Sequence, residues 1–331
     1  MKNIVLIATG GTIASAREAG GAVNAGLTGE TLLAALHAPL DGIAVTVENF
    51  AAAGSYALDL ATVFRLCRRI DAVLADAGVD GVVVPHGKDT MEESAFLAWL
   101  LVKSEKPVVF TGAQRHAGQP DTDGPRNIHD AITAAASPQL TGLGPVILFE
   151  GDIHGARYVA KTHTARVDTF RSAGLGKLGE IDGGRVYLYA RPAAARPVID
   201  PSSLDPDVEL IALGLGSTPR YLEWAGANGA SGVVLAAFGR GNAPTGFATA
   251  TAALTAAGLP VVIASRCPEG RTRAVYGRDS GGCTLVEAGG ILAGDLSPIK
   301  ARLALCAMLG AGYDLPRIAA AFAQLGDEGI R

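Results

Sequence analysis

The chain has 331 residues, of which 49% are hydrophobic and 18% are charged, and its mean hydropathy is +0.28. This length predicts about two domains, and this composition excludes an intrinsically disordered protein, which needs low hydropathy and a high net charge. The 28 basic and 32 acidic residues give a formal charge of −4, so neither nucleic acid nor a membrane surface is expected as a partner.

The sequence has no sign of a membrane span, an export signal or a metal site. No apolar run reaches the roughly 18 residues of a span, and glycines and polar residues follow the apolar stretch 4–8 too soon for a signal peptide. The four cysteines form no C-x-x-C pair, and the six histidines show no H-E-x-x-H spacing. We therefore expect a cytoplasmic protein with reduced, mostly buried thiols and no metal.

Short apolar runs recur along the chain, and a glycine, a proline or a small polar residue ends nearly every one. Such runs are typical of strands that are buried on both faces of a parallel sheet. The expected strands cover residues 4–8, 81–84, 108–110, 146–149, 209–213, 233–237 and 261–264.

Two helical stripes lie between these runs, with apolar residues at i, i+3, i+4 and i+7. The stripes consist of Val63, Leu66, Cys67, Ile70, Val73 and Leu74, and of Phe96, Trp99 and Leu100. Thr90 and Glu93 predict a capping box at the start of the second helix. Alternating strands and helices indicate α/β layers, in which ligands bind beyond the carboxyl ends of the strands.

One segment differs in composition from the rest. Residues 191–206 contain four prolines and no periodicity, which is typical of an interdomain linker. We expect a larger N-terminal α/β domain with a parallel sheet over residues 1–190, and a smaller C-terminal α/β domain over residues 207–331.

The turn Thr9–Ala14 directly follows the first expected strand. Its two glycines allow a sharp turn, and Thr12 then presents a hydroxyl at the carboxyl end of the strand. A phosphate loop would need a Gly-Lys-Ser/Thr ending, and a dinucleotide site would need G-x-G-x-x-G; the turn has neither. A nucleotide-dependent oxidoreductase is therefore not expected, and a merely structural turn is the alternative.

The turn Pro85–Glu93 places Lys88 beside Asp89, where a strand is followed by a helix. A favourable interaction with the helix dipole is the alternative explanation for Asp89. A cation near a helix N-terminus is unfavourable, so that explanation fails for Lys88.

Together the two turns resemble the T-G-G-T-I-A and H-G-T-D-T-M-E-E signatures of the bacterial L-asparaginase/glutaminase family. The matching segments are Thr9–Ala14 and His86–Glu93, and the resemblance covers essentially the whole chain with its spacing preserved. Further matches are Thr111–Arg115, Asp123–Asn127, Lys161–Thr164, Gly239–Asn242 and Gly294–Arg302.

The resemblance implies hydrolysis of a small amino-acid amide in two steps without a cofactor. A threonine in the first turn attacks the side-chain amide to form an acyl-enzyme, and water then releases the acid. The catalytic positions implied are Thr12, Lys88, Asp89 and Lys161, and the substrate-binding positions are Gly11, Ser55, Tyr56, Gly87, Asp89 and Ala113. A homodimer or homotetramer is also implied, in which a neighbouring subunit completes each site.

The sequence departs from the family pattern at several positions. Lys88 replaces the second catalytic threonine, and residues 15–28 lack the tyrosine that the family carries on a flexible loop. In the family, a glutamine or an acid commonly follows the serine that binds the substrate carboxylate. That serine is Ser55 here, and Tyr56 follows it. The acid donated by a neighbouring subunit has no clear match in residues 276–287, although Arg278, Asp279 and Glu287 lie there or nearby.

These departures leave three functions open. The chain is an asparaginase, a catalytically impaired member that binds an amino acid, or a relative in which lysine acts as a base or forms an imine. We expect Lys88 and Lys161 both to approach Asp89, which lowers the pKa of one lysine. Lys88 then serves as a base, or it turns its head to solvent and blocks the pocket.

Two roles are open for the side chain of Tyr56. It supplies the missing phenol near Thr12, or it packs against the first long helix.

Overall fold

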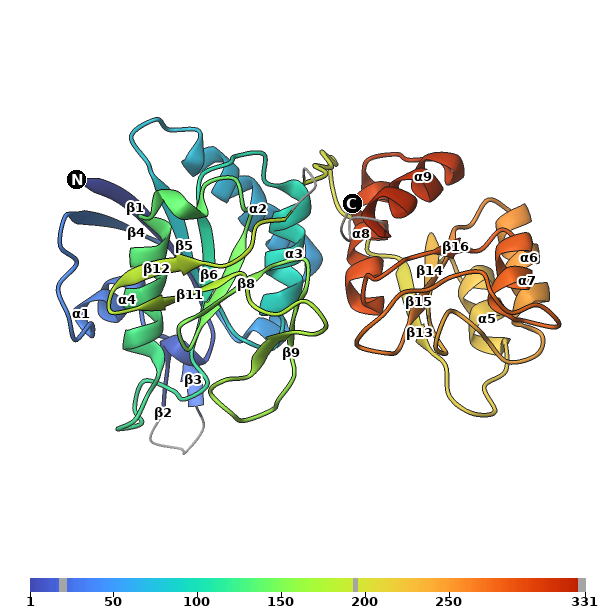
Figure 1. Ribbon diagram of the computed structural model, residues 1–331, viewed down its shortest axis with the longest axis horizontal. Helices are drawn as coiled ribbons and strands as arrows, with labels where there is room; N and C mark the ends of the chain where they lie inside the picture. Colours follow the sequence, from blue (N-terminus) through green and yellow to red (C-terminus); the bar gives the residue numbers. More distant parts are fainter. Residues whose placement is uncertain (18–22, 193–195, 327–331) are drawn as a thin grey trace. The chain divides into compact units, whose positions relative to one another are not determined.

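The computed structural model describes residues 1–17, 23–192 and 196–326, in two compact units, 1–192 and 193–331 (Figure 1). Both units have the predicted α/β construction, with the larger one N-terminal, so the predicted fold class is confirmed. Of the predicted linker 191–206, residues 193–195 lie outside the described residues, and its boundaries stay a prediction.

The sheet of the N-terminal unit has eight strands in the order β12-β11-β8-β7-β6-β5-β1-β4. Neighbouring strands from β4 to β7 are parallel, and the pairs β7–β8, β8–β11 and β11–β12 are antiparallel. The parallel strands are β1 (Lys2–Gly10), β4 (Ile43–Ala53), β5 (Gly81–Pro85), β6 (Val108–Thr111) and β7 (Val146–Phe149). The others are β8 (Asp152–Gly155), β11 (Gly179–Asp182) and β12 (Arg185–Leu188).

The sheet is therefore mixed, where the sequence predicted a parallel one. The direction changes after β7 at Glu150 and Gly151, whose φ angles are 50° and 80°. This left-handed pair returns the chain at once into β8, without the crossover helix that parallel strands require. The edge strand β4 was not predicted, because its residues are mostly half-buried and form no uniformly apolar run.

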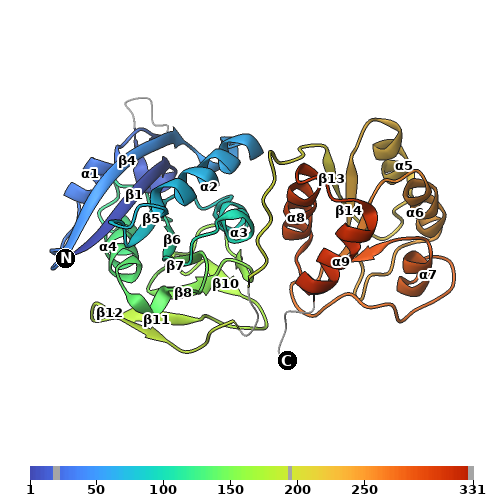
Figure 2. The same cartoon turned by 90° about the horizontal axis from the view of Figure 1, so that it is seen from above.

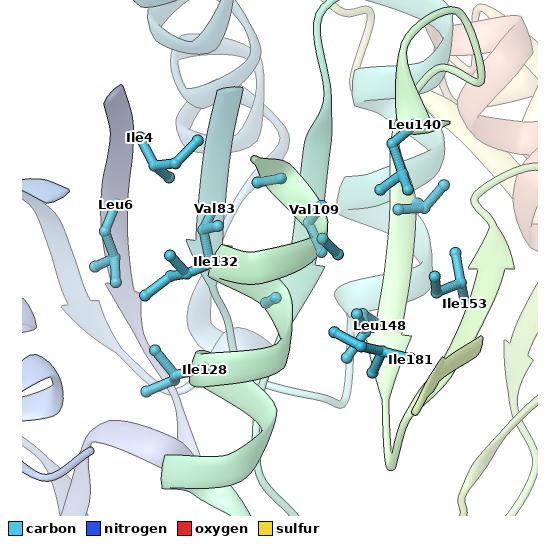
Figure 3. Close-up of a cluster of buried hydrophobic side chains, with 14 of the residues drawn as sticks. Ile4, Leu6, Val83, Val109, Ile128, Ile132, Leu140, Leu148, Ile153 and Ile181 are labelled. Carbon is cyan, nitrogen blue, oxygen red and sulfur yellow. The ribbon is translucent and has the colours of Figure 1, made fainter. Parts of the chain in front are cut away.

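Helices cover both faces of this sheet (Figure 2). One face carries α1 (Gly29–Ala34) and α4 (Gly124–Ala135), and the other carries α2 (Leu60–Leu74) and α3 (Met91–Leu101). Figure 3 shows Ile128 and Ile132 of α4 in one buried cluster with Leu6 and Val83 of the sheet. The predicted stripe of α2 is its buried side, whereas α3 is buried on nearly all sides.

The capping box predicted for α3 is wrong, although the helix does begin after Thr90. The Thr90 side chain makes no capping hydrogen bond. Its hydroxyl instead donates to the carbonyl oxygen of Ser55 at 3.0 Å. The polar contact thus ties the start of α3 to a neighbouring turn and not to the helix itself.

The smaller elements of this unit connect the large ones. Two hairpins pair β2 (Ser15–Arg17) with β3 (Val23–Ala25) and β9 (Val159–Lys161) with β10 (Phe170–Ser172). Three short 3₁₀ helices are η1 (Thr12–Ala14), η2 (Ser55–Ala57) and η3 (Pro138–Leu140).

The C-terminal unit contains a four-stranded parallel sheet in the order β13-β14-β15-β16. Its strands are β13 (Val208–Ala212), β14 (Gly232–Ala237), β15 (Val261–Ser265) and β16 (Ile291–Leu292). One face carries α5 (Arg220–Ala227), α6 (Phe247–Ala256) and α7 (Gly282–Glu287), and the other carries α8 (Pro298–Gly310) and α9 (Leu315–Gly326) (Figure 2).

The four cysteines are free, with Cys67 and Cys306 buried, Cys283 half-buried and Cys267 exposed. Within the described ranges, no helix combines the length and the apolar character needed to cross a bilayer.

Two buried histidines make the stability of the protein depend on pH. Burial lowers the pKa of His86 and of His154 to about 4, well below the value of about 6.5 in an unfolded chain. Between these values the unfolded chain binds more protons than the native protein, so the free energy of unfolding falls as the pH is lowered. The loss from pH 6.5 to 4 is about 3 kcal/mol for each histidine.

We expect His86→Asn to remove about half of this pH dependence, measured by urea unfolding at pH 7, 6, 5 and 4. His37→Asn, at an exposed position, serves as the control and keeps the full dependence. An unchanged slope in His86→Asn contradicts the assignment.

Candidate active site

The candidate site forms where β1, β4 and β5 reach the carboxyl edge of the sheet. The buried Thr9 hydroxyl at the end of β1 donates to the Pro85 carbonyl at the end of β5, at 2.9 Å. The Gly11 amide donates to the Ala53 carbonyl at the end of β4, also at 2.9 Å. These bonds hold the turns after the three strands against one another.

The turns approach too closely for any side chain to separate them. Gly11 has a φ of 82°, and a Cβ atom there would lie 2.3 Å from the Cα of Gly87. A Cβ atom on Gly87 would lie 2.6 Å from the Ser55 hydroxyl oxygen. Real Cβ atoms do not approach other atoms this closely, so both glycines are required for the three turns to meet.

A cavity of about 550 Å³ opens between these turns. Its walls are Gly11, Thr12, Ser15, Ala52, Ala53, Gly54, Ser55, Tyr56, Ala57, Gly87, Lys88 and Asp89. Most of the residues predicted from the sequence therefore line one cavity. Ala113 does not line it and is buried after β6, and Lys161 reaches the site through Asp89.

Lys88 contacts the hydroxyl of Thr12, the expected nucleophile. Its ammonium donates to Thr12 Oγ1 at 2.8 Å. Burial lowers the pKa of Lys88, and the nearby charge of Lys161 lowers it further, whereas Asp89 and Asp123 raise it. The predicted lowering of a lysine pKa is thus found at Lys88, with burial as the larger cause.

The prediction that the head of Lys88 turns to solvent is wrong. The prediction that both lysines approach Asp89 is confirmed, since the charges of both lower the pKa of Asp89. Lys161 forms the ion pair with Asp89, while the ammonium of Lys88 donates to Thr12.

Lys161 forms an ion pair with Asp89, with Nζ 2.6 Å from Oδ1. The hydrogen bond from Lys161 lowers the pKa of Asp89, which keeps the carboxylate ionised at neutral pH. Lys161 ends β9, and its backbone amide donates to the Glu92 carboxylate of α3 at 2.6 Å. Sequence reasoning missed this role of Glu92, because nothing in the signature indicates which strand its side chain meets.

Ser55 is buried and held by Thr90. The Thr90 amide donates to the Ser55 hydroxyl at 3.3 Å, in addition to the bond between the Thr90 hydroxyl and the Ser55 carbonyl. Tyr56 is 80% exposed, and its ring lies over Gly54 at the cavity wall. Packing against α2 therefore does not explain Tyr56, and a contact of its hydroxyl with Thr12 stays a prediction.

One further matching segment, Asp123–Asn127, braces another, the turn after β6 in Thr111–Arg115. The Asp123 carboxylate accepts from the amides of Gln114 and Arg115, each at 2.9 Å. The Asn127 side chain donates to the Gly112 carbonyl at 2.9 Å. These residues have a structural role that the sequence comparison alone did not reveal.

Other predicted features remain open. Residues 18–22 of the predicted flexible loop 15–28 lie outside the described residues. The acid that a neighbouring subunit donates in the family also has no match assigned. Asp279, which lies in that region of the C-terminal unit, accepts a hydrogen bond from the Thr245 hydroxyl at 3.1 Å. Among residues with a described position, no group of three or more His, Cys, Asp or Glu side chains is arranged to hold a metal ion.

Comparison with known families gives matches over most of the chain. Residues 3–194 match the family "Asparaginase, N-terminal", and residues 207–322 match the "Glutaminase/Asparaginase C-terminal domain".

Individual relatives match over nearly their whole length. The chain is 39% identical to a probable L-asparaginase of Deinococcus radiodurans, covering 98% of each chain. It is 33% identical to an L-asparaginase of Bacillus licheniformis, covering 93% of this chain and 95% of the relative. The crystal structure of a probable cytoplasmic L-asparaginase from Campylobacter jejuni superposes with a TM-score of 0.87 at 30% identity, covering 98% of this chain and 99% of that one.

We expect Gly11→Ala to reduce turnover about 100-fold, because the added methyl group pushes the first turn away from Gly87, and an error of about 1 Å costs this much. Activity assays on folded protein measure the loss. Gly214→Ala is the control, since a Cβ atom there meets only the Ser217 hydroxyl, at 3.9 Å. Full activity of Gly11→Ala would show that the close approach is dispensable.

Proposed function

Since the chain belongs to the glutaminase/asparaginase family and is an L-asparaginase-type amidohydrolase, we propose that Thr12 is its nucleophile and L-asparagine or a related small amide its substrate. The observation that carries this proposal is the place of Thr12, in the cavity wall after β1 with a lysine amine 2.8 Å from its hydroxyl. A hydroxyl is a weak nucleophile at neutral pH and needs such a neighbour.

The reaction proceeds in two halves. Thr12 Oγ1 attacks the side-chain amide carbon, the carbon–nitrogen bond breaks, and ammonia leaves an ester on Thr12. Water then attacks this ester, which releases the acid and restores the hydroxyl. The cavity of about 550 Å³ accommodates a small amino acid together with this water.

The remaining lining residues bind the substrate. Asp89 is held ionised by Lys161 and stays half open to the cavity, so it attracts the ammonium group of an amino acid. Ser55 offers its hydroxyl to the carboxylate, and Tyr56 covers the exposed side. Gly11 and Gly87 present bare backbone, which lets the substrate approach closely. Ala113 is the predicted contact with the weakest support, because it lies outside the cavity wall.

We also propose a homodimer or a homotetramer. Leu215, Tyr221 and Trp224 of the C-terminal unit expose large apolar side chains, which are typical of a surface covered by another subunit.

A cytoplasmic location is proposed as well. The relative from Campylobacter jejuni is described as a probable cytoplasmic enzyme, which supports this location. A relative from Haemophilus influenzae, with 32% identity over 92% of this chain and 88% of its own, is called periplasmic.

We expect the wild-type protein to release ammonia from L-asparagine, and Thr12→Ala to lose about 10⁴-fold in kcat, because nothing replaces the nucleophile. The melting temperature stays within a few degrees of wild type. Thr141→Ala, at an exposed position, is the matched control. Wild-type turnover by Thr12→Ala overturns the proposal, and calorimetric binding of an amino acid without ammonia release supports the impaired-member alternative.

We expect Tyr56→Phe to lower kcat/KM about fivefold, because it removes the proposed hydrogen bond of about 1 kcal/mol to the reacting hydroxyl and keeps the ring. Steady-state kinetics with L-asparagine measure the effect. Tyr221→Phe, at an exposed position in α5, is the control. Identical kinetics of the Tyr56→Phe and wild-type proteins would leave the phenol without a role.

A further inference from the structure

Lys88 replaces a threonine of the family signature and is the side chain that touches the proposed nucleophile. We propose that Lys88 is the general base that removes the proton of Thr12, and that it then delivers this proton to the departing ammonia. The inference rests on the proposed role of Thr12, and it deepens that function by assigning the proton transfer to a residue that the family signature does not contain.

The geometry suits a proton transfer in either direction. Lys88 Nζ lies 2.8 Å from Thr12 Oγ1, within the hydrogen-bond reach that a general base requires. When the amine is neutral, the Thr12 hydroxyl donates to its lone pair, and when it is protonated, the ammonium donates to the oxygen. The contact between Gly11 and Gly87 fixes the spacing of the two turns that carry this pair.

The charges around Lys88 leave its amine able to become neutral. The charged groups that act on it are Asp89, Lys161 and Asp123. Asp89 is already paired with Lys161 at 2.6 Å, and the Asp123 carboxylate accepts two backbone amide hydrogen bonds. Both carboxylates still raise the pKa of Lys88, but burial is the larger influence and favours the neutral form.

The proton balance closes with water as the only co-reactant. As Thr12 Oγ1 bonds to the amide carbon, its proton moves to Lys88 Nζ. When the carbon–nitrogen bond breaks, Lys88 Nζ passes this proton to the nitrogen, which leaves as ammonia. In the second half, Lys88 takes a proton from the attacking water and returns it to Thr12 Oγ1 as the ester bond breaks.

Three variants of Lys88 separate a base from a blocking or purely cationic side chain. Lys88→Arg keeps a donor and a permanent positive charge, Lys88→Met keeps the length, and Lys88→Thr restores the family residue. Lys2→Arg is the matched control, since Lys2 is an exposed residue at the opposite end of β1. The assay is ammonia release from L-asparagine between pH 5 and 10.

We expect each Lys88 variant to lose about 100-fold or more in kcat, the usual contribution of general base catalysis. Wild-type kcat/KM rises with pH as Lys88 loses its proton, and this rise is absent from the variants. Higher activity of Lys88→Thr would overturn the proposal in favour of blocking. Full activity of Lys88→Arg would overturn it because a fixed cation would then suffice.

A second measurement does not depend on the amide substrate. p-Nitrophenyl acetate is the probe, and acetylation of Thr12 is followed by the nitrophenolate burst and by peptide mass. We expect a burst in wild type that Lys88→Arg slows about 100-fold or more and that Thr12→Ala lacks. A Lys88-dependent burst without ammonia release supports the base and refutes the substrate. A burst that is independent of Lys88, or no burst, overturns the inference.

NMR of the lysine side chains measures the protonation of Lys88 directly as the pH is changed. The chain has seven lysines, so the signal of Lys88 is assigned as the one missing from Lys88→Arg. We expect this signal to titrate at lower pH than an exposed lysine does. Titration in the ordinary range near 10.4 overturns the inference.

Discussion

The close approach of Gly11 to Gly87 is the constraint on which the site depends. Each glycine follows a strand of the same sheet, and neither position has room for a Cβ atom. Because the two turns touch, Thr12 and Lys88, one residue further along each turn, also meet. Ser55 joins them because its hydroxyl lies against Gly87. Backbone contact, and not a network of long side chains, sets the distances between the chemical groups.

The two lysines of the site are used differently, although they are close to the same carboxylate. Lys161 arrives from a hairpin and pairs with Asp89, so that its charge and that of the carboxylate offset each other. Lys88 starts from the turn itself and is directed inward, where burial opposes its charge. An ion pair favours the charged form of a lysine and burial favours the neutral form. The same residue type therefore holds a charge at one position and is suited to lose one at the other.

The sequence allowed prediction of those elements whose signal is local. Buried strands such as β7 and the stripe of α2 follow from apolar runs and helical spacing, and the two turns follow from their signatures. The edge strand β4 and the reversal into β8 were not predicted, because edge burial and a left-handed turn leave no apolar pattern. Thr90 fits the capping pattern, but its hydroxyl donates to the Ser55 carbonyl instead. That partner is distant in the sequence, so the local pattern could not predict it. The direction of Lys88 was likewise open, because a long side chain has many rotamers and only packing selects one.

The hairpin formed by β9 and β10 is a sheet separate from the eight-stranded one. It nevertheless supplies Lys161, the counter-ion of Asp89, and its link to α3 includes the bond between the Lys161 amide and Glu92. Small peripheral sheets open by local unfolding at a lower free energy than central strands do. Opening of this hairpin would deprive Asp89 of its partner while the main sheet stays folded. The charge balance of the pocket therefore depends on a hairpin that lies outside the main sheet.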